Sequence, residues 1–270
     1  MSRKKALLIT QEMKPYNNLS DISDLVKQLP PAIQSGGMDV RVLMPRFGDI
    51  NERRNRLHEV VRLSGMNIVV GEEDHPLVIK VASMPGYRIQ VYFLDNDDFF
   101  ERSGAFHNRE DGFFKDNHER LVFFCKGVIE TVRKFGWPPD IIHCNGWLTS
   151  LIPMYLKTEF ADDPVFEGSK LIYSVYENSF EESLDKSLEK IIPVNGNIDA
   201  KHLKHFKEGN NTELNIGAMQ YADAVIKGSE ELDPKVEKAF KALKDMPVLD
   251  FEETNYVESY MNFYKMLLEE

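Results

Sequence analysis

The first 45 residues alternate between apolar runs and a helical stretch, in the order of a β-α-β unit. An apolar run over residues 6–10 ends in a polar loop, a helical pattern covers residues 20–35, and a second apolar run over residues 40–44 ends at Pro45. Short apolar runs on either side of a helix are typical of buried parallel strands. The loop after the first strand then lies at the carboxyl end of that strand, where open α/β sheets bind their ligands.

The same alternation continues along the chain and predicts a mainly parallel sheet with helices on both faces. Further strands are expected at residues 60–70, 77–84, 89–94, 140–144, 170–176 and 222–227. Further helices are expected at residues 117–134, 147–160, 212–221, 234–244 and 252–268. The strands over 60–70, 77–84 and 89–94 are separated by short turns, which favours antiparallel pairing among them. Two adjacent prolines, Pro30 and Pro31, are expected to kink or interrupt the first helix.

The last predicted helix carries a single apolar stripe. Tyr256, Tyr260, Phe263, Tyr264 and Leu267 recur at spacings of three and four residues, which places them on one face of a helix. We therefore expect this helix to pack back onto a three-layer, Rossmann-like α/β domain. The expected division is a domain over residues 1–235 and a helical tail over residues 236–270.

The charge balance argues against nucleic acid and anionic membranes as partners. Asp and Glu outnumber Lys and Arg by 44 to 33, which gives a net charge of −11, whereas both kinds of partner require a basic surface. The apolar run after Lys5 is too short for a signal peptide or a membrane span, so a cytoplasmic location is expected. Cys125 and Cys144 lie in apolar segments and are expected to be buried free thiols.

Several motifs occur in the order that they have in bacterial glycogen synthases and plant starch synthases. The opening Glu-Met-x-Pro, followed by Leu-x-Asp at residues 19–21, resembles the start of that family. The segment that runs from Pro139-Asp140 to His143-Cys-Asn-Gly-Trp147 is similar to the family's Pro-Asp-Val-x-His-x-His-Asp-Trp. Residues 116–124, 173–176 and 221–229 resemble three further family motifs. The chain is thus similar to the amino-terminal domain of a two-Rossmann-domain glycosyltransferase.

The departures from the family pattern fall at the sites where that family binds its sugar nucleotide. Asn17 and Asn18 occupy the position of a Gly-Gly pair, and the lysine of that loop has no clear counterpart here. Asn145 replaces the second histidine of the His-x-His-Asp-Trp motif, and Gly146 replaces its aspartate. Tyr176 replaces the histidine of a Val-His-Asn segment. No catalytic residue is therefore assigned.

The resemblance implies transfer of glucose from ADP-glucose or UDP-glucose to an α-1,4-glucan. Only about 40 residues follow Ser229, fewer than a second nucleotide-binding domain needs. The expectation is a glycogen/starch synthase-like domain that is weakly active or inactive alone. The alternative is a non-catalytic domain that binds glucan or regulates a full-length synthase. A homodimer or a full-length synthase is the expected protein partner, and no cofactor is expected.

The candidate ligand-binding residues are those that the motifs place at the carboxyl ends of the strands, and each has a structural alternative. They are Glu12, Asn17, Asn18, Asp21, His143, Asn145 and Trp147. Asp21 can instead cap the first helix, His143 can be a hydrogen-bonded core histidine, and Trp147 can pack rather than stack on sugar. His202 and His205 have a spacing that suits two metal ligands, but no further ligand lies near them in sequence, so no metal site is predicted.

Overall fold

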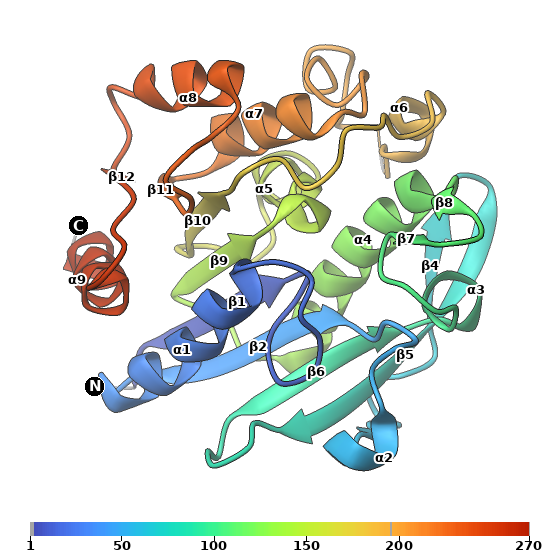
Figure 1. Ribbon diagram of the computed structural model, residues 1–270, viewed down its shortest axis with the longest axis horizontal. Coiled ribbons are helices and arrows are strands. Elements are labelled where there is room, and N and C mark those ends of the chain that lie inside the picture. The colour runs from blue at the N-terminus through green and yellow to red at the C-terminus, as the bar shows by residue number, and fades with distance from the viewer. Residues whose placement is uncertain (1–2, 195, 270) are drawn as a thin grey trace.

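The structure, a computed structural model that describes residues 3–194 and 196–269, is built around one mixed sheet. The strands follow the order β12-β11-β10-β9-β1-β2-β6-β5-β3, and β4 pairs with β5 off this path (Figure 1). Their bounds are β1 Lys5–Thr10, β2 Asp39–Pro45, β3 His58–Glu59, β4 Met66–Val70, β5 Glu73–Ser83, β6 Gln90–Asp95, β9 Ile141–Asn145, β10 Lys170–Val175, β11 Ala224–Lys227 and β12 Val248–Leu249.

The sheet is mainly parallel, as predicted. All strands from β12 to β6 pair in parallel, and β1 lies between β2 and β9. The predicted antiparallel section is confirmed, because β5 pairs antiparallel with β3, β4 and β6. The predicted strand over 60–70 was too long, since only Met66–Val70 is a strand. Val60 begins a turn, in which its carbonyl accepts hydrogen bonds from the backbone of Leu63 and Ser64, and Gly65 follows with a φ of +80°.

Helices cover both faces of the sheet. The longer helices are α1 Ile22–Ser35, α4 Asn117–Phe135, α5 Leu151–Lys157, α7 Asn211–Tyr221, α8 Pro234–Lys241 and α9 Tyr256–Glu269. The shorter ones are α2 Glu52–Asn55, α3 Asp97–Phe100, α6 Leu188–Ile191 and the 3₁₀ turn η1 Trp147–Thr149. Helix α1 contacts β2 and α9, whereas α4, α5 and α7 pack in a row. The prolines do not interrupt α1, which runs through Pro30 and Pro31 with Val26, Leu29 and Ile33 buried.

The direction of the chain along the sheet reverses beside β1. From β1 the chain moves to β2 on one side, and from β6 it crosses back to β9 on the other side and then proceeds to β10 and β11. Right-handed crossovers therefore place α1 and α4 on opposite faces. The carboxyl ends of β1 and β9 flank the point of reversal, which is where doubly wound sheets bind their ligands.

Helix α9 is anchored to the sheet by its apolar stripe and by one buried hydrogen bond. Tyr260, Phe263, Tyr264 and Leu267 are buried, which confirms that this helix packs back onto the α/β domain. The hydroxyl of Tyr264 is hydrogen-bonded to Nδ1 of His143, which lies in β9, at 2.6 Å. A helix at the end of the chain is thereby joined to the centre of the sheet.

We expect Tyr264→Phe to destabilise the fold by about 1–3 kcal/mol, because it leaves Nδ1 of the buried His143 without its partner. Urea denaturation gives the free energy of unfolding. The matched control is Tyr87→Phe, which removes a hydroxyl from a side chain that is 47% exposed and should change stability by less than about 0.5 kcal/mol. Equal stability of the two variants would show that the Tyr264 hydrogen bond does not anchor α9.

Candidate functional site

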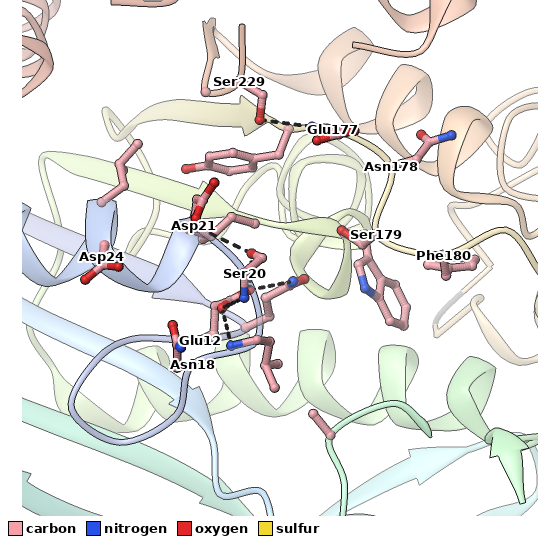
Figure 2. A pocket seen from close by; sticks show the side chains of 18 of the residues that line it. Glu12, Asn18, Ser20, Asp21, Asp24, Glu177, Asn178, Ser179, Phe180 and Ser229 are labelled. Atoms are coloured by element: carbon pink, nitrogen blue, oxygen red, sulfur yellow. Dashed lines mark hydrogen bonds between the residues drawn. The ribbon is translucent and has the colours of Figure 1, made fainter. Parts of the chain in front are cut away.

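A large cleft opens at the carboxyl ends of β1, β10 and β11. Its volume is about 1340 Å³, and its walls come from the loop after β1, helix α1, the loops after β10 and β11, and the start of α9. A small hairpin, β7 His107–Asn108 and β8 Gly112–Phe113, also contributes to it. Figure 2 shows Asp21 and Asp24 on one side of this pocket and Phe180 on the opposite side.

The cleft is lined by acidic side chains. Eleven carboxylates line it, and within residues 3–194 and 196–269 no Lys or Arg does. The carboxylates are Glu12, Asp21, Asp24, Asp49, Glu177, Glu181, Glu182, Glu230, Glu231, Glu252 and Glu253. Lys14 forms an ion pair with Asp24 at 2.5 Å, and no other of the eleven has an ion-pair partner in the described part of the chain. The local field therefore disfavours anions.

Glu12 closes the loop that follows β1. Its side chain is fully buried, and its carboxylate accepts hydrogen bonds from the backbone N–H groups of Leu19 and Ser20 at 2.9 and 2.7 Å. The Ser20 hydroxyl donates to the same carboxylate at 2.7 Å, as Figure 2 shows. Backbone N–H groups just before a helix are potential donors to a phosphate. Here they are satisfied by the protein's own carboxylate.

The two asparagines at the Gly-Gly position take different places. Asn18 is exposed and lines the cleft, where its Oδ1 accepts a hydrogen bond from the hydroxyl of Ser23 at 2.7 Å. Asn17 lies outside the cleft lining, and its Oδ1 accepts from the backbone N–H of Met13 at 2.9 Å. Neither has a positive φ, so this shortened loop has no need of glycine there. Asp21 occupies the N-cap of α1 without a side-chain capping bond and faces the cleft.

The floor of the cleft is packed and closed. His143 and Asn145 are completely buried and do not line the cleft, whereas Tyr176 does. The Tyr176 hydroxyl donates to Oδ1 of Asn145 at 2.8 Å. Gly146 has a φ of 86° and a ψ of 161°, and a Cβ there would lie 2.4 Å from Oε1 of Gln11. An aspartate in this backbone would be strained and would collide with Gln11.

His143 is a core histidine. Its Nδ1 is hydrogen-bonded to the Tyr264 hydroxyl, and its Nε2 is hydrogen-bonded to the Ser174 hydroxyl at 2.7 Å. Complete burial lowers the pKa of His143 from 6.5 to about 3. It is therefore neutral at physiological pH and has no access to a ligand in the cleft.

One wall of the cleft is aromatic, and sequence reasoning identified only Trp147 in it. We call Phe106, Phe113, Trp147 and Phe180 the aromatic wall, since all four line the cleft. Trp147 contacts Phe106 and Phe180 with ring centroids 4.7 and 4.8 Å apart, and Phe113 stacks on Phe180 at 5.0 Å. The three phenylalanines come from irregular segments and a two-residue strand, so no periodicity points to them.

The described residues contain no cluster that suits a metal ion, and none of their helices is long and apolar enough to cross a membrane. His202 and His205 instead pair with carboxylates, Asp199 at 2.9 Å and Glu213 at 2.7 Å. The two cysteines are buried and free.

Comparison with known proteins places the chain in a family. Residues 5–242 match the family described as the starch synthase catalytic domain. The glycogen synthase of Chlorobium luteolum is 38% identical over 198 residues, which make up 72% of this chain and 40% of that protein. The glycogen synthase of Chlorobaculum parvum is 34% identical over 255 residues, 89% of this chain and 51% of that protein. The chain therefore belongs to the starch synthase catalytic domain family, and it spans about half or less of the length of these relatives.

The fold agrees with a solved structure. The catalytic domain of starch synthase IV from Arabidopsis thaliana, bound to ADP and acarbose, has a TM-score of 0.74 and 16% identity. The match covers 94% of this chain and 53% of that one, and at this identity it supports the Rossmann-like α/β fold alone.

We expect protonation of His143 in the unfolded chain to destabilise the protein as pH falls. The folded pKa of about 3 lies below the unfolded value of 6.5, so the unfolded state binds more protons between these pH values and stability declines through that window. The slope attributable to this residue is about 1.4 kcal/mol per pH unit. The contribution of His143 is obtained by subtracting the unfolding free energy of the His143→Gln variant from that of the original protein at each pH. A difference that does not change with pH would show that burial does not lower the pKa of the histidine.

Glu12→Gln should destabilise the protein by about 1.5–3 kcal/mol, because a neutral amide is a weaker acceptor for the Leu19 and Ser20 N–H groups than a carboxylate. Hydrogen exchange should also report faster opening of these two amides. Glu253→Gln is the matched control, since Glu253 is an exposed carboxylate of the same cleft. If the Leu19 and Ser20 amides exchange in both variants at the rate of the original protein, Glu12 does not stabilise the loop.

Proposed function

We propose that this starch synthase-family domain binds an uncharged α-glucan in its cleft and, on its own, transfers little or no glucose from ADP-glucose or UDP-glucose. The observation that carries the proposal is the charge of the cleft: eleven carboxylates line it, and no Lys or Arg from the described residues does. Its candidate residues are Glu12, Asn18, Asp21 and Trp147, with Tyr176 at the floor.

A nucleotide sugar meets unfavourable electrostatics in this cleft. Its diphosphate is negatively charged, and like charges within about 8 Å repel even at physiological salt. Departure of a nucleoside diphosphate in the transition state requires fixed cationic donors. Lys14, the loop lysine nearest in sequence, is paired with Asp24 and lies outside the cleft lining. The N–H groups of Leu19 and Ser20 are also occupied.

A neutral glucan suits the same surface. Sugar hydroxyls donate hydrogen bonds, and carboxylates accept them without any need for a countercharge on the ligand. The apolar faces of the sugar rings suit the aromatic wall. The starch synthase IV catalytic domain, which has the same fold, was solved with ADP and acarbose, and we infer that this chain retains the carbohydrate site and not the nucleotide site.

A second proposal concerns the assembled protein. The matched relatives are about twice as long as this chain, so another polypeptide or a further segment can supply the opposite wall of the cleft. A second copy of the chain and a full-length synthase are the two protein partners to test. The division into a domain over residues 1–235 and a tail over residues 236–270 stays a prediction, and β12 from the tail pairs with β11 at the edge of the sheet.

Calorimetry should detect binding of maltoheptaose with little dependence on salt, and no binding of ADP-glucose at low salt. Labelled glucose from ADP-glucose should enter glycogen no faster with the purified chain than with a boiled control, with the same assay repeated in the presence of a full-length synthase. Turnover of about one per second by the chain alone, a typical enzymatic rate, would overturn the proposal. Failure of the chain to bind maltoheptaose would overturn the part of the proposal that concerns glucan binding.

A further inference from the structure

The aromatic wall combines flat apolar rings with a polar donor. Phe106, Phe113 and Phe180 are partly exposed and border the open cleft. Trp147 lies behind them at 2% exposure and contacts both Phe106 and Phe180. The wall is therefore an apolar surface in an otherwise acidic cleft.

The donor of this wall is unsatisfied. Nε1 of Trp147 is buried and has no hydrogen-bond partner among the described residues, whereas a buried indole N–H usually finds an acceptor. An unpaired buried donor is destabilising, and a ligand that brings an oxygen atom would relieve it. A cationic side chain would not, because ammonium and guanidinium groups have no acceptor.

Carboxylates flank the wall on the same loop. Phe180 is followed directly by Glu181 and Glu182, which are exposed and line the cleft, as does Glu177. A ligand on this wall thus meets apolar rings against its face, carboxylate acceptors at its edge and one indole donor. A pyranose ring has this pattern, since its C–H groups form apolar faces and its hydroxyl groups both donate and accept.

We propose that the aromatic wall is a stacking subsite for one glucose ring of an α-1,4-glucan, with Nε1 of Trp147 donating to an oxygen of that sugar. The inference rests on the proposed function and adds the place where the glucan is held. Nε1 is covered in this structure, so the ligand reaches it by displacing a neighbouring ring. Phe180 is the ring that shifts, from its contact with Trp147 to a stacking contact with the sugar, because it belongs to the irregular loop 177–182, most of whose side chains are exposed.

The test uses the two tryptophans, which lie beyond opposite ends of β9. The ring of Trp137 lies 4.5 Å from the Arg41 guanidinium, away from the cleft lining. Trp137→Phe leaves Trp147 as the single tryptophan and the single indole N–H reporter. Titration with maltoheptaose should shift the indole N–H resonance of Trp147, and cellohexaose is the control for the linkage. In the same background Phe180→Ala should weaken maltoheptaose binding about tenfold, as expected for loss of an aromatic stacking partner. Phe180→Trp should retain binding, because it restores a flat ring.

Phe251→Ala is the matched control, since Phe251 lines the same cleft outside the aromatic wall, and its affinity should be unchanged. Thermal denaturation checks that each variant is folded. If maltoheptaose binds with equal affinity to the Phe180→Ala variant and leaves the Trp147 resonance in place, the subsite is elsewhere and the proposed function stands. If maltoheptaose does not bind the original protein, the proposed function fails together with the subsite. A shift caused by a lysine-rich peptide and not by the glucan would identify the wall as a protein-docking surface.

Discussion

The parallel pairing of β1 with both β2 and β9 is the constraint on which the rest of the structure depends. Five residues of β1 pair with each neighbour, and the chain leaves β1 in one direction along the sheet and returns to β9 from the other. This reversal puts α1 and α4 on opposite faces, and the cleft opens at the carboxyl ends of β1, β10 and β11. It also places His143 at the centre of the sheet, where Tyr264 of α9 forms a hydrogen bond with it.

The ligand that we propose for this cleft follows from its charge. A shared fold does not carry a shared activity, because activity belongs to the site built on the fold. The family relationship here is firm, yet the described lining of the cleft offers no cation to a diphosphate. The carboxylate of Glu12 satisfies the N–H groups at the start of α1, so even the backbone presents little positive potential. The neutral, hydroxyl-rich ligand that we propose would avoid this repulsion and could donate hydrogen bonds to the carboxylates of the cleft.

The sequence predicted the layers, the parallel sheet and the returning helix, because these depend on apolar periodicity that each segment carries by itself. Tertiary packing overrides local preference in the first helix: the expected interruption at the prolines does not occur, because α1 continues through Pro30 with its apolar face buried. At the site, sequence reasoning identified the loops but not the orientation of each side chain. Glu12, Asn18, Asp21 and Trp147 line the cleft, but Asn17, His143 and Asn145 do not. The phenylalanines of the aromatic wall lie in irregular segments and in a two-residue strand, and they come together only in the folded protein, so no local sequence pattern predicts them.

The three departures at the floor form one packed unit. The absence of a Cβ at Gly146 leaves the space that Gln11 fills, and Gln11 donates through Nε2 to the Glu12 carboxylate at 3.3 Å. On the other side, Oδ1 of Asn145 accepts a hydrogen bond from the hydroxyl of Tyr176. The ring of Tyr176 lies so close to Gly228 that a Cβ on Gly228 would be 2.3 Å from the ring. Asn145 and Tyr176 are therefore hydrogen-bond partners, and an aspartate at position 146 would collide with Gln11, which already fills that space. Packing thus fills this part of the floor with uncharged, hydrogen-bonded side chains, which supports the proposal that the domain binds a neutral glucan rather than a nucleotide sugar.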